Sequence, residues 1–315
     1  MRLNYRKFLA AGTLLVGLSS CVVGGEPANI EDWPGMASLQ ISHATGGDYH
    51  LCGATMISEE WVLTAAHCVE LAKPQKNEAG QARIIQFQRS ADPEQGLRNL
   101  GPLKIVAGLG DLSADPTEQT FDVAEMYIHP DYTASQAHRG HDVALLKIAG
   151  TWTGPIATLD GILAPPVRYR RDEVEVAGYG FLFEAGSAES AIGKRGAVNA
   201  PSLALQQASV PTLSPNACKR RMETTIGRLE DKSSFEGMMI SRDTHICAGV
   251  GEVDSCTGDS GGPLVHRPED GDPVQIGIVS WGMGCARADA PGIYVRVAHY
   301  SDWIVATTSD GSSAT

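Results

Sequence analysis

The chain contains the hexapeptide Gly258-Asp259-Ser260-Gly261-Gly262-Pro263, in which glycines lie on both sides of a serine. Glycines let a backbone approach a substrate carbonyl closely and point N–H groups at its oxygen, as an oxyanion hole requires. A serine is a weak nucleophile until a base activates it, and that base is itself oriented by a carboxylate. The hexapeptide therefore predicts nucleophilic chemistry at Ser260, with a histidine and an aspartate elsewhere in the sequence.

The candidate base is His67, which follows a strand-like run in Leu63-Thr64-Ala65-Ala66-His67-Cys68. The candidate carboxylate is Asp142, which opens the apolar run Val143-Ala144-Leu145-Leu146. The chain has nine histidines, so His67 is distinguished only by this context. Three other histidines are expected to have structural or loop roles: His129, His141 and His299.

Length and composition favour a folded, turn-rich β protein. With 315 residues, 43% of them hydrophobic, the chain can bury a large core, and no internal repeat suggests a solenoid. The 35 glycines and 17 prolines separate short strand-like runs, such as Glu173-Val174-Glu175-Val176. One helix is expected near the end, at 299–307, with Tyr300, Trp303 and Ile304 on one face. A formal net charge of −12 makes a nucleic-acid binder with a basic face improbable, so no nucleic-acid partner is expected.

At these motifs the chain resembles the chymotrypsin/trypsin family of serine proteases. The matches follow the family's order: VVGG at 22–25, CGATMI at 52–57, TAAHC at 64–68, DVALL at 142–146, GDSGGP at 258–263 and SWG at 280–282. The resemblance implies an all-β fold of two packed six-stranded antiparallel β-barrels with a C-terminal helix. The expected divisions are an N-terminal barrel at 22–150, a C-terminal barrel at 151–298 and a terminal helix and tail at 299–315.

The resemblance also assigns roles to individual residues. It implies that Ser260 attacks the peptide carbonyl, that His67 moves the proton and that Asp142 orients His67. The backbone N–H groups of Gly258 and Ser260 would form the oxyanion hole. The implied activity is that of a serine endopeptidase acting through an acyl-enzyme, without a cofactor, on protein or peptide substrates; a monomer is expected.

A specificity pocket is implied by Asp254, six residues before Ser260. In the family this position forms the pocket floor, and a buried carboxylate there favours a cationic Arg or Lys side chain at the cleavage site. The expected pocket walls and opening come from four more residues: Ser280, Trp281, Gly282 and Gly292. The alternative is that Asp254 is only a solvated loop carboxylate.

The seven cysteines are an odd number for an exported chain. Six cysteines allow fifteen pairings, and the resemblance selects three: Cys52–Cys68, Cys218–Cys247 and Cys256–Cys285. Cys21 is left without a partner. No metal is expected, because the sequence lacks HExxH and any Cys/His cluster with zinc spacing. Asp111 and Glu118 fall where the family sometimes has a calcium loop, but that loop is shortened here.

Residues 1–21 are expected to form an export signal. Three positive residues precede an apolar run at 8–18 that is too short to span a bilayer. The end of this segment, Leu18-Ser19-Ser20-Cys21, resembles the bacterial lipobox, in which the cysteine is lipid-modified. The alternative is ordinary signal cleavage after Cys21. Either way, the protein is expected to be secreted, periplasmic or attached to the cell envelope.

The resemblance implies that a new N-terminus at Val22 inserts and pairs its ammonium with Asp259, arranging the amides of Gly258 and Ser260. Loss of one partner of such a buried pair costs about 3–5 kcal/mol. A lipidated Cys21 still joined to Val22 would prevent the pairing. A tethered form would then be a latent zymogen until that bond is cut.

Three further interpretations stay open at this stage. The stretches 70–100 and 219–242 are polar or charge-rich and are expected to be solvated insertions. Gly258 to Gly262 also satisfies the G-x-S-x-G elbow of α/β-hydrolases, but only 55 residues follow Ser260, and they are strand-like. The chain could also be a catalytically silent binding module that has kept a protease fold.

Overall fold

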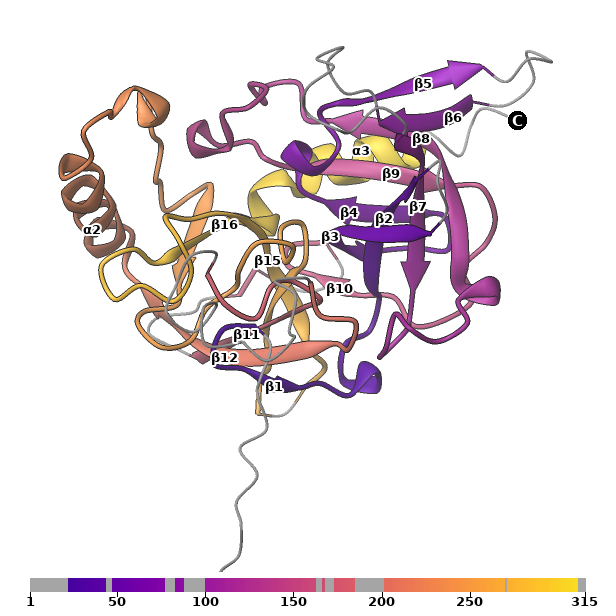
Figure 1. Cartoon of the computed structure of the whole chain (residues 1–315), viewed down its shortest axis with the longest axis horizontal. Coiled ribbons are helices and arrows are strands. Elements are labelled where there is room, and N and C mark those ends of the chain that lie inside the picture. Colours follow the sequence, from indigo (N-terminus) through magenta and orange to yellow (C-terminus); the bar gives the residue numbers. More distant parts are fainter. Residues whose placement is uncertain are drawn as a thin grey trace, which may run out of the picture.

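The chain folds into two β-barrels that lie side by side (Figure 1). This structure is a computed structural model, and it describes residues 22–43, 47–76, 83–87, 100–162, 166–167, 173–184, 201–269 and 271–310. The predicted export segment 1–21, with Cys21, lies outside the described residues, as do parts of the predicted insertion at 70–100. The predicted all-β fold of two six-stranded antiparallel barrels with a C-terminal helix is confirmed.

The first barrel closes when its first and last strands in the ring, β2 and β7, pair with each other. Its six strands are β2 (Met36–His43), β3 (Asp48–Met56), β4 (Trp61–Thr64), β9 (Ala144–Ile148), β8 (Thr120–Ile128) and β7 (Leu100–Ala107). A hairpin of β5 (Ala72–Lys76) and β6 (Arg83–Phe87) extends this sheet from β7. This hairpin corrects the expectation of an unstructured loop at 70–100, where alternation was too weak to predict strands.

The second barrel closes in the same way through β12 and β13. Its six strands are β12 (Gln206–Leu213), β11 (Glu173–Gly178), β14 (Pro263–His266), β15 (Val274–Trp281), β16 (Gly292–Arg296) and β13 (His245–Ala248). Two short strands attach to it: β10 (Thr158–Leu159) pairs with β15, and β1 (Glu26–Pro27) pairs with β12. Residues 26–27 therefore lie on the second barrel, although the predicted boundary at residue 22 assigns them to the first.

In the described part of the chain, two α-helices, α2 and α3, lie on the outside of the barrels (Figure 1). The predicted C-terminal helix is present as α3 (Ser301–Asp310), after a 3₁₀ turn at Val297–Tyr300. Tyr300 and Ile304 are each 2% exposed and join the core of the first barrel, against which Trp303 also packs, so the predicted face is confirmed. The two terminal segments thus exchange barrels. Strand β1, near the start of the described chain, pairs with the second barrel, whereas helix α3, at its end, packs on the first barrel.

The other helix, α2 (Pro215–Gly227), precedes α3 in the chain and corrects the expectation of a solvated loop at 219–242. Its start is well defined because Ser214 caps the N-terminus, accepting from the Ala217 N–H, and Pro215 occupies the first turn. Cys218, Met222 and Ile226 form its buried side at a helical spacing. The many charges on its other side concealed this pattern in the sequence.

The three predicted disulfides are confirmed: Cys52–Cys68, Cys218–Cys247 and Cys256–Cys285. Cys52–Cys68 and Cys218–Cys247 each join a barrel strand to a neighbouring helical segment. Cys256–Cys285 braces the loop before Ser260. Short 3₁₀ turns complete the described structure at Ile30–Asp32, Ala66–Cys68, Thr117–Gln119, Ala137–Arg139 and Ser233–Phe235.

Candidate active site

The pairing of β4 with β9 brings His67 next to Asp142, 75 residues further along the chain. His67 lies in the 3₁₀ turn that follows β4, and Asp142 lies two residues before β9. The His67 Nδ1–H donates to Asp142 Oδ2 at 2.7 Å, and the His67 backbone N–H donates to Oδ1 at 2.8 Å. Ser280 Oγ donates to Oδ2 at 2.5 Å. The Asp142 carboxylate is therefore fully buried and held by three donors.

Burial and electrostatic attraction have opposite effects on the pKa values of His67 and Asp142. Burial opposes the charge on both groups, but the attraction between His67 and Asp142 and their hydrogen bond outweigh it. The pKa of His67 is therefore raised above its usual 6.5, and the pKa of Asp142 is lowered below its usual 3.8. His67 is thus oriented with Nδ1 toward the carboxylate, which leaves Nε2 as the nitrogen that can accept a proton.

Ser260 is positioned by one backbone contact to the first barrel and by another, next to it, within the second barrel. The Gly53 N–H of β3 donates to Ser260 O at 2.8 Å, and the Gly261 N–H donates to Val279 O at 2.8 Å. Gly261 has a φ of +81°, and a Cβ there would lie 2.2 Å from Thr64 Oγ1, so the position requires glycine. The positive φ and the close contact with Thr64 therefore explain why a glycine directly follows Ser260.

Ser260 and His67 both lie close to Cys68. Cys68 Sγ lies 3.7 Å from His67 Nε2 and 3.7 Å from Ser260 O. Among the described residues no hydrogen bond joins Ser260 Oγ to His67 Nε2. Such bonds are often long before substrate binds and tighten in the complex.

The turn at Gly258 depends on the buried carboxylate of Asp259. Gly258 has a φ of +96°, which favours glycine. Asp259 is completely buried and accepts from the Gly180 N–H at 2.8 Å and from the Cys256 N–H at 2.8 Å. Burial raises its pKa to about 6. In the described part of the chain, no ion pair to Asp259 is present.

Val22 lies in the core of the second barrel, the barrel that also carries this turn. It is 0% exposed and joins the core cluster of Val174, Val176 and Leu264. Its neighbour Val23 forms an antiparallel bridge with Asp254, whose N–H donates to Val23 O. The segment at 22–27 therefore enters the barrel that carries the Asp259 turn.

One cavity contains every residue predicted to bind substrate. It has a volume of about 300 Å³ and is lined by Ser260 together with Asp254, Ser280, Trp281, Gly282 and Gly292. Asp254 is 2% exposed; its Oδ2 accepts from the Ala286 N–H at 3.3 Å, and its Oδ1 has no hydrogen-bond partner among the described residues. Burial raises the pKa of Asp254 to about 7. Gly292 is needed here, because a Cβ would lie 2.8 Å from Oδ1.

The rim of this cavity carries an ion pair that no sequence motif predicts. Glu184 lines the cavity, and Arg287 binds both of its carboxylate oxygens, at 2.5 and 3.1 Å. Arg287 follows Ala286, whose N–H contacts Asp254. The ion pair therefore anchors the segment that forms part of the cavity floor.

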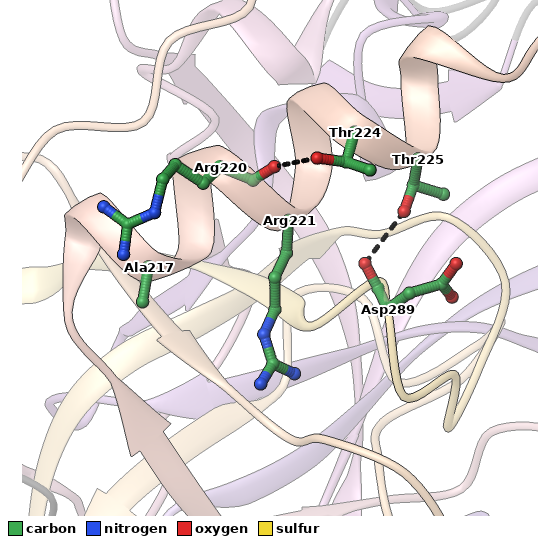
Figure 2. A pocket seen from close by; sticks show the side chains of 6 residues that line it. All are labelled: Ala217, Arg220, Arg221, Thr224, Thr225 and Asp289. Atoms are coloured by element: carbon green, nitrogen blue, oxygen red, sulfur yellow. Dashed lines mark hydrogen bonds between the residues drawn. The ribbon is translucent and has the colours of Figure 1, made fainter.

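A second cavity, of about 360 Å³, lies beside α2 and contains no predicted site residue. Its lining residues are Ala217, Arg220, Arg221, Thr224, Thr225 and Asp289 (Figure 2). Thr225 Oγ1 donates to Asp289 O at 2.9 Å, and Arg221 Nη1 donates to Ala288 O at 2.8 Å. Helix α2 thus contacts residues 288 and 289, which directly follow Arg287.

Sequence reasoning missed three residues that shape the Asp259 turn. Cβ atoms at Gly178 and Gly180 would lie 2.1 and 2.6 Å from Asp259 Oδ1, so both must be glycine. His50 Nε2–H donates to Gly258 O at 2.9 Å, while its Nδ1 accepts from Ser38 Oγ. Burial lowers the pKa of His50 to about 4. The Gly-Tyr-Gly run at 178–180 was the available signal for this contact.

Comparison with known proteins agrees with this arrangement. The family model described as Trypsin matches residues 22–304. The chain is also 33% identical over 295 residues to transmembrane protease serine 9 of Rattus norvegicus, covering 91% of this chain but only 22% of that relative. The chain therefore spans about a fifth of that protein's length. In the part of the chain that the structure describes, no helix is long and apolar enough to cross a membrane. The chain belongs to the trypsin family of serine proteases.

Proposed function

We propose that this protein is an exported endopeptidase that cleaves peptide bonds after Arg or Lys. The observation that carries the proposal is the buried Asp254 carboxylate in the cavity that Ser260 also lines, whose Oδ1 has no partner in the part of the chain that the structure describes. Leaving a buried carboxylate without partners is costly, and a guanidinium or ammonium would supply both charge and hydrogen bonds. The same cavity would therefore bind an apolar side chain poorly.

The geometry supports a Ser-His-Asp mechanism with Ser260, His67 and Asp142. His67 Nε2 takes the Ser260 proton as Oγ attacks the substrate carbonyl, and Asp142 stabilises the imidazolium that forms. The N–H groups of Gly258 and Ser260 stabilise the oxyanion. His67 then donates its proton to the leaving amine, and water hydrolyses the acyl-enzyme through the same groups.

The amine of Val22, once the Cys21–Val22 bond is cut, supplies the cation that Asp259 lacks. Three observations support this step: Val22 is buried in the second barrel, Val23 pairs with Asp254, and the Asp259 carboxylate is buried without a cation. The chain with this bond intact is then latent. If Cys21 carries lipid, the same cut releases the enzyme from a membrane.

Export is supported by the three disulfides, because such bonds persist mainly in oxidising compartments outside the cytosol. Intact-mass and N-terminal analysis of the native protein tests this part. Protein beginning at Val22 is expected in the active fraction. An active fraction that begins with lipidated Cys21 would contradict the insertion of Val22.

The decisive test measures hydrolysis of matched ester substrates with Arg, Lys, Phe or Ala before the cleaved bond. Protein processed to begin at Val22 is expected to turn over the Arg and Lys esters, and Ser260→Ala to turn over none. Folding is checked by circular dichroism. A folded, correctly processed protein that hydrolyses none of the esters would reveal a silent binding module and overturn the proposal.

A further inference from the structure

Three potential metal ligands meet on the first barrel, next to Asp142. His129 directly follows β8, Asp131 lies in the next turn, and His141 directly precedes Asp142. Each offers one ligand atom, and the three atoms lie within 4.8 Å of one another. Asp131 is exposed and both histidines are half-buried, so the group is open to solvent.

The protein holds these rings in place before any ligand binds. The His129 backbone N–H donates to Val143 O at 3.1 Å, which ties the two segments together. The two imidazoles stack with centroids 5.2 Å apart and an angle of 13° between their planes. The rings of Tyr300 and Trp303 contact His129 edge-on from the C-terminal helix region. Helix α3 and the preceding turn thus form a wall behind the cluster.

The orientation of His141 is suited to ligation. Its Nδ1 lies 3.3 Å from Tyr300 Oη, which leaves Nε2 as the available nitrogen. A hydrogen bond at the other nitrogen is the usual way in which a metal-binding histidine is oriented. The backbone of His141 has a φ of +58°, so the surrounding structure maintains an uncommon conformation at this residue.

We propose that His129, Asp131 and His141 bind a divalent transition metal, with Zn²⁺ as the best fit. Two imidazole nitrogens and a carboxylate oxygen are typical zinc ligands, and a water molecule would complete a tetrahedron. Ca²⁺ and Mg²⁺ prefer oxygen ligands, so two imidazole nitrogens make this cluster a poor site for either ion. Zinc ligands lie about 2.0–2.2 Å from the ion, so the side chains must close together slightly when it binds.

The metal is expected to inhibit the enzyme, a consequence that rests on the proposed function. The ion would bind to the residue adjacent to Asp142, on a segment whose conformation fixes that carboxylate against His67. A nearby dication also opposes the positive charge that His67 acquires during catalysis. Zinc should therefore lower kcat more than it changes KM.

Binding is measured first, without activity, by titrating the full chain carrying Ser260→Ala with Zn²⁺ in a calorimeter and with Co²⁺ in a visible absorption cell. One equivalent is expected, with tetrahedral Co²⁺ absorption. His141→Asn removes one ligand yet tolerates positive φ, because asparagine adopts this conformation readily. Asp131→Asn removes the carboxylate from an exposed position. Each variant should bind at least about tenfold more weakly.

The matched control is Asp272→Asn, which removes an exposed carboxylate from the β14–β15 turn. It should bind Zn²⁺ as tightly as the parent chain. In the active enzyme, Asp131→Asn should keep its basal activity and lose sensitivity to Zn²⁺. Equal binding by the parent, His141→Asn and Asp131→Asn chains would overturn the site. Normal binding without inhibition of an active enzyme would overturn only its regulatory consequence.

Discussion

Ser280 Oγ and His67 Nδ1 donate hydrogen bonds to the same carboxylate oxygen, Asp142 Oδ2, at 2.5 and 2.7 Å. Ser280 was predicted to line the substrate cavity, and it does so while also contacting Asp142. Its hydroxyl therefore connects the cavity wall to the group that orients His67.

Replacing Ser280 with alanine should weaken the placement of Asp142. A hydrogen bond to a charged group contributes about 1.5–3 kcal/mol, so the free energy of unfolding should fall by about that amount. kcat should fall roughly tenfold with little change in KM, because substrate contacts remain. Chemical denaturation and ester kinetics measure both effects. Ser42→Ala, which removes an exposed Ser–Asp hydrogen bond of 2.7 Å, is the control and should change neither.

Asp254→Asn should remove the preference for cationic substrates. Loss of one partner of a buried ion pair costs about 3–5 kcal/mol, so kcat/KM for Arg esters should fall by about 10²- to 10⁴-fold. The Phe ester should be affected far less. If Arg and Phe esters lose activity equally, Asp254 supports the fold rather than specificity.

The pKa of about 7 for Asp254 also predicts two pH effects with opposite signs. A cationic substrate binds the ionised carboxylate, so KM for Arg esters should fall as the pH rises from about 6 to 8. In the unliganded protein, the folded state binds the proton more tightly than the unfolded state. This carboxylate therefore costs stability increasingly as the pH rises from about 4 through 7. Asp254→Asn should raise the Tm at pH 8 and remove the KM trend.

Gly178→Ala should disrupt the Asp259 turn by steric conflict alone. The new Cβ would lie 2.1 Å from Asp259 Oδ1, a distance that forces the carboxylate or the strand to move. Overpacking of this kind costs about 1–3 kcal/mol in stability, and displacement of the turn should abolish most ester hydrolysis. Gly227→Ala is the control, because a Cβ there meets nothing within 4 Å. It should be neutral or slightly stabilising at the end of α2.

In the proposed mechanism, the raised pKa of His67 should set the acidic limit of activity. His67 must be neutral to accept the serine proton, so kcat/KM should fall as the pH drops through a pKa above 6.5. Asp142→Asn removes the attraction that raises this pKa. The acidic limb should then move to lower pH, and kcat should fall by roughly 10⁴-fold. A profile that is unchanged in Asp142→Asn would contradict the assigned roles.

The sequence predicted the barrels and the disulfides, and it picked out residues that line one cavity with Ser260, because these depend on short motifs with fixed neighbours. It did not predict α2, whose buried side is hidden among charged residues, or the β5–β6 hairpin, whose alternation is weak. The clash of Gly178 with Asp259 depends on tertiary distances across the second barrel. Similarly, His129, Asp131 and His141 have no metal-binding spacing along the chain and meet only after β8 and β9 pair.

The crossing of the two terminal segments has a consequence for folding. Strand β1 completes its pairing only on the second barrel, whereas α3 finds its core only on the first. Each barrel therefore depends on chain from the opposite end of the sequence, and these contacts have very large sequence separation. Such topology slows folding and makes unfolding cooperative. Neither half should form a stable unit when produced alone, and the two barrels should melt in one transition.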